Sequence, residues 1–121
     1  MALSRTTHHP ECVAATWLAE RLAVDPARIE AMRRAGELIA VREARATEWL
    51  YPAWQFESWA PRPGVPRVVA AARATGMADE RLYEILVAPL GMTRGHVERR
   101  LADLLVEGRI DDVVGAIRSS S

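Results

Sequence analysis

The stretch that decides the fold is residues 17–56, which read WLAERLAVDPARIEAMRRAGELIAVREARATEWLYPAWQF. Apolar residues at helical spacing predict that a helix over 12–22 leads into it. The Asp-Pro pair at residues 25 and 26 predicts the start of a second helix, 26–35, because Asp can cap free amide groups and Pro fits the first turn. Gly36 predicts the end of this helix, since glycine readily adopts the left-handed conformation that closes helices.

A short hairpin is expected after the second helix. Residues 38–41 and 48–51 predict two strands, and the polar segment that joins them predicts a wing at 42–48. Residues 52–59 predict one or two helical turns. The Pro-Arg-Pro-Gly run at 61–64 predicts a linker, because Pro and Gly interrupt regular structure.

The order helix, short turn, capped helix, Gly and short hairpin is that of a winged helix-turn-helix. The run WLAERLAVD at 17–25 resembles the first helix and turn of excisionase- and MerR-like DNA-binding domains. The run RAGELIAVR at 34–42 resembles the exit of their recognition helix and their first wing strand. This resemblance implies a double-stranded DNA partner, read by the helix 26–35 and the wing 42–48.

The second half of the chain is expected to be helical. Four apolar stripes follow at helical spacing, and Asp79 and Asp111 are expected to cap the helices that they precede. The patterns together predict a mainly α protein, with a flexible arm at 1–11, a winged helix-turn-helix at 12–60 and a C-terminal four-helix region at 61–121. The stripes are Val65, Val68, Val69 and Ala72; Leu82, Ile85 and Leu86; Val97, Leu101, Leu104 and Leu105; and Val113, Val114 and Ile117.

A second resemblance lies in the C-terminal half. The runs PGVP at 63–66, APLG at 88–91 and LADLLVEGR at 101–109 resemble the C-terminal helical domain of Xre/MbcA/ParS-type antitoxins. Small actinobacterial DNA-binding proteins join a winged helix-turn-helix to a similar helical tail, and the chain from 12 to 117 resembles them. The resemblance implies a partner protein, or a homodimer, through the C-terminal helices.

Five arginines are the expected DNA-binding residues. On a helical wheel Ile29 and Met32 mark the buried side of the second helix, so Arg34 points away from the core. Arg28 and Arg33 lie on the two flanks of the helix, and the remaining two arginines belong to the wing. The predicted set is Arg28, Arg33, Arg34, Arg42 and Arg45.

The same region departs from the pattern of such DNA-binding domains. Pro26, Ala27, Glu30 and Ala31 stand where polar or basic residues are usual, and over 25–48 five arginines face five acidic residues. A neutral surface of this kind favours weak, salt-sensitive binding. Two alternatives therefore stay open: a helix-turn-helix that serves only as a scaffold, and an antitoxin-like module that binds a cognate partner through the C-terminal helices.

Five of the seven aromatic residues fall within eleven positions of the chain. Aromatic side chains contribute strongly to domain contacts, so this cluster favours a seam where the wing packs on the C-terminal helices. The alternative is a base-stacking platform or a partner groove. The cluster comprises Trp49, Tyr51, Trp54, Phe56 and Trp59.

Composition excludes several classes of protein. Sixteen cationic residues balance sixteen acidic ones, which excludes the strongly basic surface of a non-specific nucleic-acid coat protein. The single cysteine, Cys12, excludes an internal disulfide and a Cys-rich zinc module. No phosphate loop, nucleophile motif or metal-ligand pair is present, so we expect no enzyme activity, no cofactor and no metal. The chain has no apolar run long enough for a membrane span, and we expect a cytoplasmic regulator of transcription.

Overall fold

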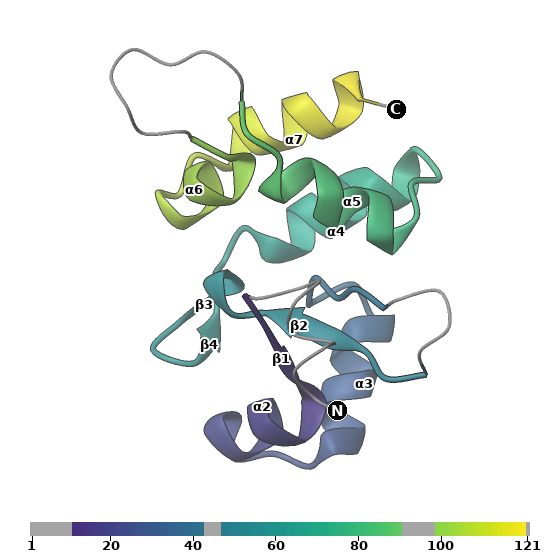
Figure 1. Ribbon diagram of the computed structural model, residues 1–121, viewed down its shortest axis with the longest axis vertical. Helices are drawn as coiled ribbons and strands as arrows, with labels where there is room; N and C mark the ends of the chain where they lie inside the picture. The colour runs from purple at the N-terminus through teal and green to yellow at the C-terminus, as the bar shows by residue number, and fades with distance from the viewer. Residues whose placement is uncertain (1–10, 43–46, 91–98, 121) are drawn as a thin grey trace.

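The structure is a computed structural model that describes residues 11–42, 47–90 and 99–120. The protein is mainly helical, with two small antiparallel strand pairs. In chain order its elements are β1 (Cys12–Ala14), α2 (Ala15–Leu22), α3 (Pro26–Arg34), β2 (Leu50–Pro52), the 3₁₀ turn η1 (Ala53–Gln55), β3 (Phe56–Glu57), β4 (Ala60–Pro61), α4 (Val65–Ala74), α5 (Asp79–Val87), α6 (Leu101–Val106) and α7 (Ile110–Ser119). Figure 1 shows two layers, with α4 to α7 in one and α2, α3, β1 and β2 in the other.

The N-terminal layer is built on α2 and α3, which pack against each other. The turn between them begins at Ala23, whose φ of 58° is left-handed. Helix α3 starts at Pro26, as the sequence predicts, with Asp25 at the N-cap position; within the described residues its carboxylate makes no capping hydrogen bond. The buried residues of this core are Leu18, Ala19, Ile29, Leu38, Ala40, Tyr51 and Phe56.

The strand pairing differs from the predicted hairpin. Residues 12–14, predicted as the first turn of a helix, form β1, which pairs antiparallel with β2. The predicted strand 38–41 is also wrong, because within it Val41 makes a single bridge, to Leu50, and the other three residues are irregular. Short apolar runs fit a helix or a strand equally well, so packing rather than spacing selects the partner. Residues 43–46 of the predicted wing lie outside the described residues.

The segment 52–59 is not the helix of one or two turns that the sequence predicts. One 3₁₀ turn, η1, is followed by the tight hairpin β3–β4. Ser58 and Trp59 form the hairpin turn, with φ of 51° and 59°. Two-residue hairpin turns favour positive φ at both positions, since this backbone twist matches that of the flanking strands.

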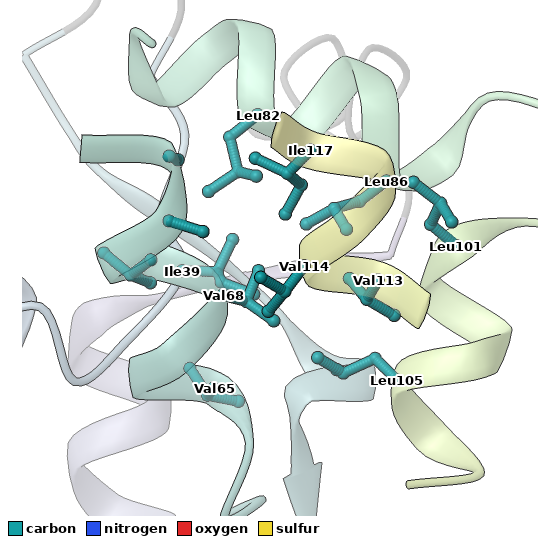
Figure 2. Close-up of a cluster of buried hydrophobic side chains, with 13 residues drawn as sticks. Ile39, Val65, Val68, Leu82, Leu86, Leu101, Leu105, Val113, Val114 and Ile117 are labelled. Atoms are coloured by element: carbon teal, nitrogen blue, oxygen red, sulfur yellow. The ribbon is translucent and has the colours of Figure 1, made fainter. Parts of the chain in front are cut away.

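The C-terminal layer has an aliphatic core. Helix α4 packs on α7, and α6 packs on both α5 and α7. Figure 2 shows their side chains converging between the helices, with Ile39 entering from the N-terminal half. The apolar stripes of the sequence are thus core, apart from Val97, which lies outside the described residues. The buried residues are Ile39, Val65, Val68, Val69, Ala71, Ala72, Leu82, Leu86, Leu101, Leu105, Val113, Val114 and Ile117.

Two predicted helix caps are displaced by one or two residues. Asp79 and Asp111 lie within the first turns of α5 and α7, whose N-cap residues are Ala78 and Arg109. The carboxylates remain favourable there, because the N-terminal end of a helix carries partial positive charge.

The predicted aromatic seam is confined to Trp54. This side chain packs against the C-terminal core and against a small cluster formed by Cys12, Val41, Leu50 and Tyr83. The other four aromatic residues of the predicted cluster pack into the N-terminal core instead, so the prediction is wrong for them. Tyr51 of β2 and Phe56 of β3 are buried in that core, and Trp49 and Trp59 are partly buried against it.

A buried glutamine fixes the junction of the two layers. Gln55 is fully buried, and its Oε1 accepts a hydrogen bond from the Ile39 amide at 2.6 Å. Its Nε2 donates to the carbonyl of Ile39 at 2.7 Å and to that of Pro52 at 3.1 Å. These bonds satisfy backbone groups in a stretch without a strand partner, so that Ile39 can enter the C-terminal core.

Candidate functional site

Helix α3 is exposed on the side opposite Ile29, its buried residue. Small side chains dominate this face, so the helix backbone lies close to the molecular surface. The residues lining its shallow groove are Ala27, Glu30, Ala31, Arg34 and Ala35.

Arg34 is the most prominent side chain of this face. Its side chain is 71% exposed, and its Nη2 lies 2.5 Å from Glu30 Oε2. An exposed ion pair of residues four apart on a helix contributes only about 0.3–0.5 kcal/mol. Glu30 therefore orients Arg34 without holding it firmly. Arg28, one turn nearer the start of α3 than Met32, is also exposed.

Two further arginines meet on one tryptophan. The guanidinium carbon of Arg33 lies 4.1 Å from the centroid of the Trp49 ring, and that of Arg42 lies 4.6 Å from it. A guanidinium stacked on an aromatic ring still directs its N–H groups outward in its own plane. Trp49 thereby holds the exposed Arg42 beside the end of α3.

Arg33 points inward, unlike the other arginines of α3. Its side chain is 15% exposed and lies 3.9 Å from Glu30, and its Nε is buried without a hydrogen-bond partner among the described residues. Burial raises the pKa of Tyr51, and the charge of Arg33 and a hydrogen bond with it act in the opposite direction. Arg33 thus links α3 to the N-terminal core as well as to Trp49.

Of the predicted DNA-binding residues, the structure brings Arg33, Arg34 and Arg42 together and leaves Arg28 nearer the other end of α3. Arg45 lies outside the described residues. Sequence reasoning missed two residues that contact these arginines or the helix end that carries them. One is Trp49, which the sequence pattern places in the aromatic seam. Arg73 of α4 reaches the end of α3 from another layer, and no local pattern signals that contact.

The described part of the chain holds no group of three or more His, Cys, Asp or Glu side chains that could bind a metal ion. None of the helices within residues 11–42, 47–90 and 99–120 is long and apolar enough to cross a membrane. The side chains that meet at the end of α3 are mainly guanidinium groups.

Comparison with known proteins identifies the fold alone. No protein-family model matches the chain, and no curated protein matches it. Among solved structures the chain is similar to the NMR structure of Rv2175c, with a TM-score of 0.74 and 23% sequence identity. The similarity covers 90% of this chain and 80% of that chain. At this identity the two share an architecture, and the function must be argued from the residues.

Proposed function

We propose that the protein binds double-stranded DNA as a winged helix-turn-helix regulator of transcription, with α3 in the major groove. The observation that carries the proposal is the exposed face of α3, which is lined by small side chains and ends in grouped arginines. In helix-turn-helix proteins the second helix enters the major groove, and the segment after it contacts the sugar-phosphate backbone.

The small residues of α3 suit a close approach to base edges. Ala27 and Ala31 lie on its exposed face beside Arg34. Alanine methyl groups can pack on the methyl group of thymine, and arginine can donate two hydrogen bonds to guanine. The alanines, which depart from the usual polar pattern, are thus compatible with readout of a mixed sequence.

The grouping of arginines at the end of α3 supports a polyanionic partner, although both the chain and its residues 25–48 are neutral in sum. The end of α3 gathers four arginines. Arg33 and Arg34 lie beside Glu30, Arg42 stacks on Trp49, and Arg73 donates to the backbone carbonyls of the last turn. Phosphates attract such a group strongly at low salt. Because the Glu30 pair is exposed, exchanging it for a phosphate or a base requires little free energy.

The proposal is tested by selecting bound sequences from a random duplex library and titrating the selected duplex. Enrichment of one motif is the expected result. Arg34→Ala should weaken binding by about 1–3 kcal/mol and relax selectivity at one base pair. The fold should persist, because the position is exposed and alanine favours helix.

The matched control is Arg81→Ala on α5, which removes an exposed arginine that pairs with Glu84 at 3.6 Å. This variant should bind the selected duplex as the unmodified chain does. Equal affinity of Arg34→Ala and the unmodified chain, with the fold intact, would remove α3 from the interface. The function would then rest with partner binding through the C-terminal helices.

A further inference from the structure

An arginine of the C-terminal layer closes the last turn of α3. Arg73 Nη2 donates to the carbonyl of Arg33 at 2.9 Å, and Nη1 donates to the carbonyl of Arg34 at 3.0 Å. The last carbonyl groups of a helix have no partner within the helix and carry partial negative charge. One guanidinium from α4 thus gives the Arg34 carbonyl a donor and the Arg33 carbonyl a second donor, beside the Gly36 amide at 3.1 Å. Its charge lies where the helix favours a cation.

Gly36 leaves the space that this contact needs. Its φ is +82°, a backbone conformation that is strained for any residue with a side chain. A Cβ atom there would lie 3.0 Å from Arg73 Nη1. The same region forms a groove between the end of α3 and α4, lined by small residues and by Arg73. Gly36 therefore both ends α3 and admits the guanidinium.

The helix that carries Arg73 is rigidly anchored. Val68, Val69 and Ala72 of α4 are buried in the C-terminal core, and α4 packs along α7. A guanidinium held by such a helix can fix the orientation of the last turn of α3, whose carbonyls it binds. The orientation of α3 therefore depends on where the C-terminal layer lies.

We propose that Arg73 is a positioning residue through which the C-terminal helices set the orientation of α3 on DNA. This inference rests on the proposed function and deepens it. It makes the selectivity for DNA sequence depend on the C-terminal layer, which does not itself enter the major groove. Arg73 acts through the carbonyls of Arg33 and Arg34 and does not itself bind phosphate. Its loss lets the end of α3 shift, so bonds to bases weaken while contacts with phosphates remain.

The experiment compares Arg73→Ala, Arg73→Lys and the control Arg67→Ala in the full chain. Arg67 is an exposed arginine of the same helix whose hydrogen bond and ion pair within the described residues are with Asp111 of α7. Its removal therefore reproduces the loss of one positive charge without the loss of the contact with α3. Affinity is measured for the selected duplex and for a random duplex at several salt concentrations. Amide hydrogen exchange is measured by NMR in the last turn of α3.

Arg73→Ala should lose about 2- to 30-fold in the ratio of selected to random affinity, with an unchanged salt slope. Amide exchange near Gly36 should accelerate. Arg73→Lys should recover part of both effects, because an ammonium can donate to the carbonyls without matching both at once. Arg67→Ala should behave as the unmodified chain. Arg73→Lys also keeps the test decisive if the alanine variant fails to fold.

Different failures have different meanings. Absence of DNA binding by the unmodified chain overturns the proposed function and this inference together. Binding by the unmodified chain with an equal selectivity ratio in Arg73→Ala overturns the inference alone. A salt slope smaller by about one, with selectivity retained, identifies Arg73 as a phosphate contact and also overturns it.

Discussion

The C-terminal helices and the end of α3 use arginine in opposite ways. In the C-terminal layer each of several arginines has an acidic partner nearby. At the end of α3, Arg33 and Arg34 share Glu30, Arg42 stacks on Trp49, and Arg73 donates to backbone carbonyls. A formal charge of zero thus conceals arginines that differ in what they contact. Total charge describes solubility, but the distribution of charge selects the partner. The paired arginines of the C-terminal layer are Arg67 with Asp111, Arg81 with Glu84, Arg99 with Glu107, and Arg109 with Asp112.

The two layers also differ in how they are stabilised. The C-terminal core is aliphatic, whereas the N-terminal core depends on aromatic side chains of β2, β3 and the segments beside them. All four tryptophans, at positions 17, 49, 54 and 59, lie outside the C-terminal helices. Tryptophan fluorescence therefore reports on the N-terminal layer and on the junction.

The largest expected effect tests whether the layers unfold together. Ile117→Ala, deep in the C-terminal core, should lower the free energy of unfolding by about 2–5 kcal/mol, because it leaves a cavity. Urea unfolding followed by tryptophan fluorescence and by far-UV circular dichroism should give coincident, shifted midpoints. A fluorescence midpoint that stays in place would mean that the N-terminal layer is an independent unit.

The second largest effect is expected from Gln55, at the junction of the two layers. Gln55→Leu keeps the side-chain volume but leaves the amide and carbonyl of Ile39 buried and unpaired. The expected loss is about 2–4 kcal/mol in the free energy of unfolding, measured by urea titration. Glu57→Leu, at an exposed position two residues later, is the control and should change stability by less than about 0.5 kcal/mol. Equal stability of the two variants would contradict the role given to Gln55.

The buried thiol of Cys12, at the same junction, predicts that the stability of the protein depends on pH. Burial raises the pKa of its thiol from 9.0 to about 12; a hydrogen bond with Tyr83 lowers the pKa, and the charge of Glu11 raises it. The unfolded chain ionises at lower pH than the folded one, so the stability from this group is complete below pH 9.0 and decreases as pH rises toward about 12.

Between pH 8 and pH 10 the unmodified chain should lose on the order of 1 kcal/mol more stability than Cys12→Ser, which has no thiol to ionise. Urea unfolding of both chains at the two pH values measures the difference. Parallel pH profiles would show that the thiol is accessible to solvent in the folded protein.

The smallest expected effect distinguishes the arginines at the end of α3 from the paired arginines of the C-terminal layer. Arg42→Ala should reduce the slope of log affinity against log salt by about one and weaken binding evenly across sequences, because a stacked guanidinium beside α3 suits phosphate. Arg109→Ala, which breaks an exposed pair with Asp112, should leave DNA affinity unchanged and stability within about 1 kcal/mol. Titration by fluorescence anisotropy at three salt concentrations measures both. Equal slopes in the two variants would remove the distinction between the regions.

Much of the helical structure could be predicted from short patterns. The helix predicted at 26–35 is α3, Pro26–Arg34, and Gly36 closes it with positive φ. The apolar stripes identify the buried faces of α4 to α7, because side chains three and four positions apart share a helix face. Of the candidate site, the exposure of Arg34 also follows from the helical wheel, which places Arg28 and Arg33 alike on the flanks of the helix.

The tertiary structure alone decided which distant groups meet. Residues 12–14 became a strand because β2 is their partner, and Arg33 turned inward because Trp49 and Tyr51 lie beside it. Arg73 reaches α3 because packing of α4 on the C-terminal core brings the two helix ends together. Helical spacing relates residues within one or two turns, whereas close packing and the pairing of backbone groups choose partners across the whole chain. The sequence by itself thus determined the helices and their buried faces. Only the tertiary structure determined which distant groups each arginine contacts.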